Sequence, residues 1–264
     1  MNKLNSIEPI KNNFSFANGL TKVPELTLGF WVIKIMATTL GETAGDALSM
    51  SLNLGYLIST FIFFAIFLVL VKAQVNANQF KPFLYWTTII ATTTAGTTLA
   101  DFATRSLGIG YSGGSALLLL LMLTSLLLWY KTLGFISVHS VSSPRAEMFY
   151  WVSIMFSQTL GTALGDWTAD TAGLGYIGAA TIFGGLLLLI VLLHYFTNLS
   201  KTFIFWVAFI ITRPLGAVLG DFLDKPFSAG GLALSRYSIS AALLFLMLAC
   251  LWLFPQRAAK NFAH

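Results

Sequence analysis

The segment "MATTLGETAGD" (36–46) places three threonines, two glycines and two carboxylates between stretches that are otherwise strongly apolar. Near copies of this segment follow at "ATTTAGTTLAD" (91–101), "FSQTLGTALGD" (156–166) and "ITRPLGAVLGD" (211–221). Each copy ends in an aspartate, and successive aspartates are 55, 65 and 55 residues apart. Self-similarity at a nearly constant period is the signature of a repeat protein. The chain is therefore organised as four repeats.

Other residues keep a constant spacing from these motif aspartates. A tryptophan lies fifteen residues before each aspartate, a glycine lies five residues before it, and a small residue precedes it directly. Another glycine lies nine residues after each aspartate. The motif residues, in repeat order, are Asp46, Asp101, Asp166 and Asp221; Trp31, Trp86, Trp151 and Trp206; Gly41, Gly96, Gly161 and Gly216; and Gly45, Ala100, Gly165 and Gly220.

The composition is that of a membrane protein. Hydrophobic residues make up 56% of the 264 residues and charged residues only 9%, whereas soluble domains carry roughly 25% charged residues. Apolar runs at 57–71, 116–130, 177–193 and 239–254 approach, with their flanks, the ~20 residues that a helix needs to cross a bilayer. Runs this long and continuous predict helices rather than barrel strands. We expect an all-α polytopic fold whose partner is the lipid bilayer.

Each repeat predicts a motif helix, a short connection at the glycine and a very apolar second helix. The repeats, at about 28–72, 83–131, 148–195 and 203–254, supply eight transmembrane helices in one membrane domain at 28–254, between tails at 1–27 and 255–264. Two helices per repeat make every copy enter the membrane in the same direction. The longer interval between the second and third aspartates suggests paired halves, so both a pseudo-four-fold bundle and a bundle of paired halves stay open.

The basic residues predict the orientation. Ten lysines and arginines lie on the side of the chain termini and three on the opposite side, and cytoplasmic loops carry the excess of such residues. Both termini are therefore expected in the cytoplasm. Basic residues beside membrane spans act as topology signals, so the net charge of +5 is not an indication of nucleic-acid binding.

The pattern of tryptophans resembles a family of bacterial membrane proteins built from four tandem repeats of unknown function, each with two transmembrane segments and a characteristic tryptophan. The matching residues are Trp31, Trp86, Trp151 and Trp206, and the resemblance covers about 28–254. It implies a multi-pass protein of the bacterial inner membrane. It implies no activity, so function has to be inferred from the residues.

The motif helix carries a polar face. Positions seven, four and three before the aspartate lie within about 60° of it on a helix, and in repeat one these are Thr39, Glu42 and Thr43. Eleven residues before the aspartate the face turns apolar, with Ile35, Ile90, Met155 and Ile210. Small residues four apart let membrane helices approach closely. We therefore expect the motif helices to form the inside of the bundle, with a polar vestibule open to the outside and an apolar ring on the cytoplasmic side. The repeated tryptophans are expected at the cytoplasmic interface of the membrane, and the aspartates in its outer part.

These side chains favour transport of a cation. Carboxylate and hydroxyl oxygens are hard ligands, suited to protons, Na⁺, Mg²⁺, Ca²⁺ or Mn²⁺, and a small organic cation is an alternative substrate. Membrane carboxylates are costly and usually face a cavity or a partner. The predicted binding residues are Glu42, Asp46, Asp101, Asp166, Asp170 and Asp221 with Thr39, Thr94 and Thr159, and the metal candidates among them are Glu42, Asp46 and Asp166. The gating or charge-balancing residues are Lys34 and Arg213. The helix-packing glycines are Gly41, Gly45, Gly96, Gly161, Gly165, Gly216 and Gly220.

Two other function classes stay open. A membrane sensor or partner protein that transports nothing would have its carboxylates neutralised by Lys34, Arg105, Arg213 and Lys225, without a continuous wet path. An intramembrane enzyme is less favoured, because no nucleophile, zinc or phosphate-loop signature occurs, although Asp166 and Asp170 are spaced for acid–base work. We expect no enzyme and no required cofactor beyond a bound hard cation. A homo-oligomer is compatible with the sequence.

Overall fold

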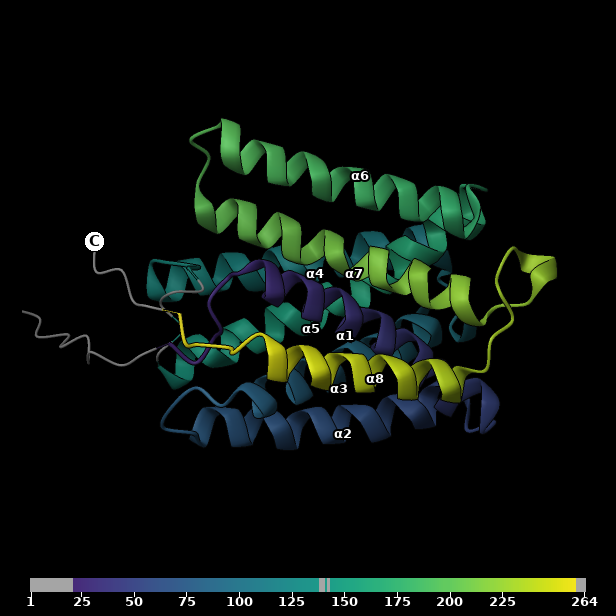
Figure 1. The fold of residues 1–264 in the computed structure, drawn as a ribbon, viewed down its shortest axis with the longest axis horizontal. Helices are drawn as coiled ribbons and strands as arrows, with labels where there is room; N and C mark the ends of the chain where they lie inside the picture. Colours follow the sequence, from purple (N-terminus) through teal and green to yellow (C-terminus); the bar gives the residue numbers. More distant parts are fainter. Residues whose placement is uncertain (1–20, 138–140, 142, 260–264) are drawn as a thin grey trace, which may run out of the picture.

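The computed structural model describes residues 21–137, 141 and 143–259, and in these residues eight long α-helices follow one another (Figure 1). The four successive helix pairs agree with the bounds of the predicted repeats to within a few residues. The helices are α1 (Leu28–Asp46), α2 (Gly55–Asn76), α3 (Pro82–Asp101), α4 (Gly110–Leu133), α5 (Pro144–Asp166), α6 (Gly175–Phe196), α7 (Lys201–Asp224) and α8 (Arg236–Leu253). The all-helical fold class is thus confirmed.

The four motif helices form a closed inner ring. Helix α1 packs against α3, α3 against α5, α5 against α7, and α7 against α1. The second helix of each repeat packs mainly against the motif helix of the following repeat: α2 on α3, α4 on α5, α6 on α7, and α8 back on α1. Figure 1 shows α6 alongside α7 in this way. Each repeat is therefore completed by its neighbour, and the last repeat closes on the first.

The motif glycines make this ring close-packed. The glycine five residues before each aspartate faces the residue eight positions before the aspartate of the next motif helix. A Cβ atom at Gly96, for example, would lie 3.0 Å from the backbone of Gln158, and one at Gly41, Gly161 or Gly216 would overlap its neighbour. The four contacts are Gly41 with Thr93, Gly96 with Gln158, Gly161 with Arg213, and Gly216 with Thr38.

The outer helices present apolar side chains to the surroundings. Leu120, Ile177 and Phe245 are examples of large hydrophobic residues that stay exposed on α4, α6 and α8. Five helices, α2, α4, α6, α7 and α8, are long and apolar enough to cross a membrane. Helices α1, α3 and α5 are less apolar because they contain threonines, glycines and acids. These residues face inward. An exposed apolar surface of this extent indicates a membrane protein.

The two ends of the bundle differ. The far end holds the four motif aspartates, and the terminal end holds residues 21–27 and 255–259, where the described parts of the chain begin and end. At the terminal end the two segments pair: Glu25 N donates to Arg257 O over 2.8 Å, and Ala259 N donates to Val23 O over 2.9 Å. Val23 is buried against the core. Residues 21–27 thus belong to the folded domain and cover its terminal end, rather than to a free tail.

The repeated tryptophans, which we expected at the cytoplasmic interface of the membrane, are largely enclosed by other side chains. Trp86, Trp151 and Trp206 are buried, and Trp31 is half-buried. The residues directly before them, Phe30, Tyr85, Tyr150 and Phe205, are buried as well, and the eight rings pack edge-on or tilted against one another. This aromatic layer fills the inner ring near its terminal end.

The α-helical hydrogen bonding ends at the first three motif aspartates. The chain continues in the π-helical turns η1 (Ala47–Ser51), η2 (Phe102–Ser106) and η4 (Trp167–Thr171). Gly55, Gly110 and Gly175 then adopt φ of 74°, 73° and 63°, a left-handed conformation that glycine adopts without steric cost. This explains the glycine nine residues after each aspartate. Repeat four differs, because α7 continues to Asp224.

Candidate functional site

A buried ion pair occupies the middle of the inner ring. Arg213 of α7 donates from Nη2 to Glu42 Oε2 of α1 over 3.0 Å, and neither side chain is exposed beyond 4%. The same nitrogen donates to Thr97 Oγ1 of α3 over 2.7 Å and to Thr162 Oγ1 of α5. One guanidinium thus binds side chains from the three other motif helices. Gly161 makes room for it, since its missing side chain leaves space for the Arg213 stem.

The four motif aspartates are held together by two bases at the far end. Arg105 Nε lies 3.0 Å from Asp101 Oδ1, and Arg105 Nη2 lies 3.1 Å from Asp166 Oδ2. Lys225 Nζ lies 3.1 Å from Asp221 Oδ1 and also pairs with Asp46. Both bases stand four residues after an aspartate and bridge it to the aspartate of the next repeat. The bridges join repeats two to three and four to one, which makes the ring of charges pseudo-two-fold.

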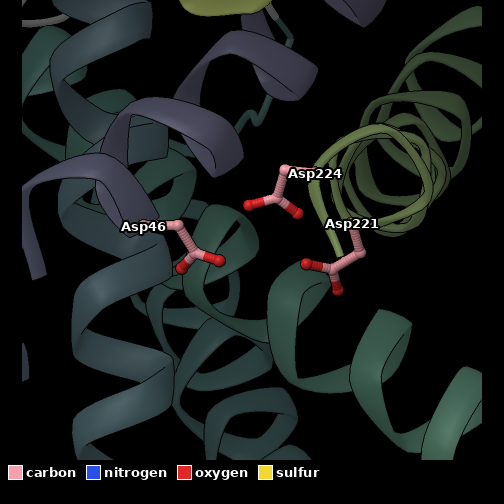
Figure 2. A group of neighbouring side chains, drawn as sticks. All are labelled: Asp46, Asp221 and Asp224. Atoms are coloured by element: carbon pink, nitrogen blue, oxygen red, sulfur yellow. The ribbon is translucent and has the colours of Figure 1, made fainter. Parts of the chain in front are cut away.

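Three carboxylates converge beside Lys225. Side-chain oxygens of Asp46, Asp221 and Asp224 lie within 4.8 Å of one another, and Figure 2 shows the three groups pointing toward a common point. Arg236 of α8 pairs with Asp224 and lies 3.9 Å from Asp46. These residues could hold a hard cation. The set differs from the predicted Glu42, Asp46 and Asp166, because Glu42 lies in the central pair and Asp166 pairs with Arg105. Asp224 is absent from the predicted set, although its spacing of three from Asp221 places it on the same helical face.

The predicted threonines contribute to packing rather than to the carboxylate site. Thr39, Thr94 and Thr159 are buried, and each hydroxyl donates to a carbonyl of its own helix, over 3.0, 2.8 and 2.9 Å. The threonines that reach the charged groups are Thr97 and Thr162, four residues before their aspartates. They lie on the polar face that the spacing identified, at the position equivalent to Glu42.

Four stretches of the chain, residues 29–79, 84–134, 149–200 and 204–258, match the family model described as Repeat of Unknown Function (DUF347). The chain belongs to this family. The match confirms the four tandem repeats, and their bounds follow the helix pairs. No curated protein sequence matches the chain, and no solved structure does.

Two of the predicted site residues in the DUF347 repeats, Asp170 and Lys34, form none of the ion pairs described above. Asp170 is exposed at the far end. Lys34 is fully buried, and its Nζ lies 4.0 Å from the centroid of the Phe209 ring without a hydrogen-bond partner in the described part of the chain. Lys34, Ile89, Ile154 and Phe209 occupy equivalent positions, twelve residues before the aspartates, and all four are buried. These four residues form the layer that crosses the inner ring. Ile35, Ile90 and Ile210, which belong to the apolar ring expected from the sequence, are only half-buried.

Charge is distributed unevenly along the DUF347 repeats. Seven of the ten acidic residues belong to the middle or the far end, with five bases, Lys34, Arg105, Arg213, Lys225 and Arg236. By sequence, the other ten bases belong to the terminal side with only three acids. Lys225, which follows the end of α7, stays an ammonium: burial lowers its pKa, but Asp221 and Asp46 raise it by more, so that the net pKa is above its ordinary value. The far end therefore has more carboxylates than bases.

Proposed function

We propose that this protein spans the bacterial cytoplasmic membrane eight times, with both termini in the cytoplasm, and transports a proton or a hard cation through the ring of motif helices. The uneven distribution of lysine and arginine supports the orientation. The apolar outer helices support the span count, because each of them pairs with a motif helix of similar length. The far end would then face the outside.

The observation that carries the proposal is the set of carboxylates around the axis of the inner ring, which outnumber the bases that hold them. Ionisable groups inside a membrane protein are costly and usually line a pathway. Arg105 and Lys225 are each shared between two aspartates. An entering cation can therefore take one carboxylate while the base keeps the other, so that no charge is left uncompensated.

The central pair has the position of a gate. A cation that moves from the far end toward the cytoplasm must pass the layer in which Arg213 binds Glu42, Thr97 and Thr162. Passage requires Glu42 to exchange Arg213 for the cation. The oxygen-only ligand set favours protons, Na⁺, Mg²⁺, Ca²⁺ or Mn²⁺ over copper or zinc.

The first test compares Asp166→Asn with Asp170→Asn. Asp166 is buried and paired, whereas Asp170 is exposed one turn later on the chain, which makes it a matched control. We expect Na⁺, Mg²⁺ or Mn²⁺ to raise the melting temperature of the purified wild-type protein. The effect should weaken as the pH falls from about 9 to 5, because protons compete for the same oxygens.

Asp166→Asn and Asp46→Asn should lower the apparent cation affinity at least about tenfold, the equivalent of ~1.4 kcal/mol. Equal loss in Asp170→Asn would contradict a specific site.

The second test concerns topology. Reporter fusions at residue 264 and within 134–143 should report the cytoplasm, and fusions within 106–110 or 225–235 should report the opposite side. The reason is the excess of lysine and arginine at the terminal end. A carboxy-terminal fusion that reports the outside would contradict the proposed orientation.

A second candidate function is a membrane protein that transports nothing. It is favoured by one observation: Glu42 and each motif aspartate pair with a base in this structure. In that case no hard cation would stabilise the wild-type protein at any pH between about 5 and 9, and no flux would be measured in proteoliposomes.

A further inference from the structure

Beyond the central ion pair, the inner ring contains polar atoms that the carboxylate site does not use. Lys34 Nζ, Arg213 Nη1 and both amide atoms of Gln158 are buried and have no hydrogen-bond partner among the described residues. They come from α1, α7 and α5 and occupy two successive layers, eight and twelve residues before the aspartates. Folded proteins leave few buried polar groups unpaired, and such groups commonly have a functional role or bind internal water.

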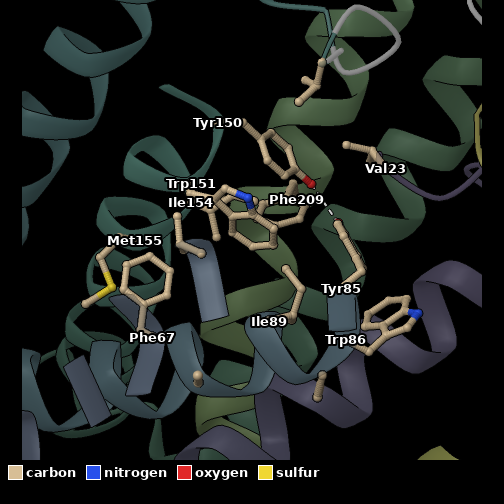
Figure 3. Close-up of a cluster of buried hydrophobic side chains, with 14 of the residues drawn as sticks. Val23, Phe67, Tyr85, Trp86, Ile89, Tyr150, Trp151, Ile154, Met155 and Phe209 are labelled. Atoms are coloured by element: carbon tan, nitrogen blue, oxygen red, sulfur yellow. Dashed lines mark hydrogen bonds between the residues drawn. The ribbon is translucent and has the colours of Figure 1, made fainter. Parts of the chain in front are cut away.

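Lys34 is the only residue of its layer with a titratable side chain. The equivalent residues are Ile89, Ile154 and Phe209, and Figure 3 shows these three beside the aromatic layer. The charged or titratable groups nearest along the axis are Arg213 of α7 and Glu42 of α1 on the far side, and Tyr85 of α3 and Tyr150 of α5 on the terminal side. Helix α8, which also packs on α1, carries Arg236 and Tyr237 at the far end and Cys250 toward the terminal end.

The two tyrosines continue the line of titratable groups toward the terminal end. Their hydroxyls share a hydrogen bond of 2.7 Å, drawn as a dashed line in Figure 3, with Val23 beyond them. Glu147 lies one helical turn before Tyr150 on α5, closer to the terminal end, and pairs with Lys22 over 2.7 Å. Along the inner ring, titratable residues thus follow one another from the motif aspartates through Glu42 and Lys34 to the tyrosine pair and Glu147.

We propose that Lys34 is a proton-carrying side chain that links the far half of the inner ring to its terminal end, so that the protein moves protons, either as its substrate or in exchange for another cation. This inference deepens the proposed function and rests on it. The supporting geometry is the position of Lys34 in a buried layer between the central ion pair and the tyrosine hydroxyls.

Lysine suits this role where arginine does not. Removing the proton from Lys34 breaks no hydrogen bond to a described residue. It gives up only the cation–π attraction to the Phe209 ring, 4.0 Å from Nζ. Arginine keeps its proton in proteins, so Arg213 can hold a charge but cannot pass a proton on. In one cycle Lys34 Nζ accepts a proton from one side and releases it to the other. The side chain returns to its starting state, and one proton has crossed the layer.

The experiment measures proton flux in proteoliposomes that contain the pH-sensitive dye pyranine, under a membrane potential set by a potassium gradient and valinomycin. We expect Lys34→Met and Lys34→Arg to lower the flux of the wild-type protein by about a hundredfold. Lys34→Met removes the proton site and leaves no acceptor unpaired, while Lys34→Arg keeps the charge but not the exchange. Ile89→Met, at the equivalent position of repeat two, is the matched control for repacking and should keep the wild-type flux.

Loss of flux in both Lys34 variants, with flux retained in Ile89→Met, would support the proposal. Unchanged flux in Lys34→Met, or no proton flux in the wild type, would overturn it. Stabilisation of the same preparations by Na⁺, Mg²⁺ and Mn²⁺ is measured in parallel. Cation stabilisation without proton flux overturns the role of Lys34 alone. Proton flux that depends on Lys34, without cation stabilisation, supports that role and overturns transport of a metal ion.

Discussion

Replacement of Arg213 by methionine is expected to destabilise the protein by about 3–5 kcal/mol, since removing one partner of a buried ion pair leaves the other charge uncompensated. Glu42 would lose its only base, and Thr97 and Thr162 would lose the donor that joins them to it. Helices α3 and α5 would then lose their side-chain hydrogen bonds to Arg213 of α7. Helix α1 would keep only the bond from Thr38 Oγ1 to Thr212 O, over 3.4 Å, in this layer. Reversible unfolding in detergent, followed by far-ultraviolet circular dichroism, measures the loss.

The double variant with Glu42→Gln and Arg213→Met provides the control. Because it leaves no isolated charge, it should be more stable than Arg213→Met alone, with a coupling energy of about 1–3 kcal/mol. Neither far-end bridge is altered in this comparison, since Arg105 and Lys225 contact other carboxylates. Wild-type stability of Arg213→Met would contradict the central position of the pair.

Addition of a single methyl group at Gly161 is the second change with a large expected effect. A Cβ atom at this position would overlap Cγ and Cβ of Arg213, and both lie in the tightly packed interface of α5 with α7. Overpacking of this kind costs about 1–3 kcal/mol and occasionally more. We expect Gly161→Ala near the upper end of this range and Gly161→Leu not to fold. Gly216→Ala, which would overlap Thr38, should behave in the same way.

Gly184 supplies the matched control. It lies within α6, and a Cβ atom there would meet nothing within 4 Å. Gly184→Ala should therefore leave the unfolding midpoint in detergent unchanged or raise it, because alanine favours a helix over glycine by about 1 kcal/mol. Equal destabilisation by Gly161→Ala and Gly184→Ala would mean that the motif glycines do not set the spacing of the inner ring.

The repeat itself could be predicted because it is a local pattern. The spacing of Trp31, Gly41 and Asp46, repeated four times, sets the length of each motif helix and the face on which its small and polar residues lie. Apolar runs mark the second helices for the same reason: the length needed to cross a bilayer and the helical period are properties of a single segment. The eight helices, their order and the inward position of the motif helices therefore follow from the chain alone.

The partners of the charged residues depend on contacts between repeats. Arg105 stands four residues after Asp101, and this spacing predicts their pairing along one helix, but its second partner, Asp166, is 61 residues away. Lys225 reaches Asp46 only because α7 closes the ring on α1. The tryptophans, expected at the cytoplasmic interface of the membrane, are buried by contacts that the sequence does not show. Trp206 of α7 packs against Trp129 of α4, with ring centroids 6.0 Å apart, and Trp86 of α3 lies beside Met247 of α8.

The sequence by itself determined the four repeats, the helix bounds, the apolar outer surface and the residue types of the candidate site, because each depends on spacing within one helix or one pair of helices. Only the tertiary structure decided which carboxylate meets which base, that Glu42 binds Arg213 across the ring, and that Lys34 has no partner among the described residues. The contact of Lys225 with Asp46 joins residues 179 positions apart, and its geometry is set when the fourth motif helix packs against the first.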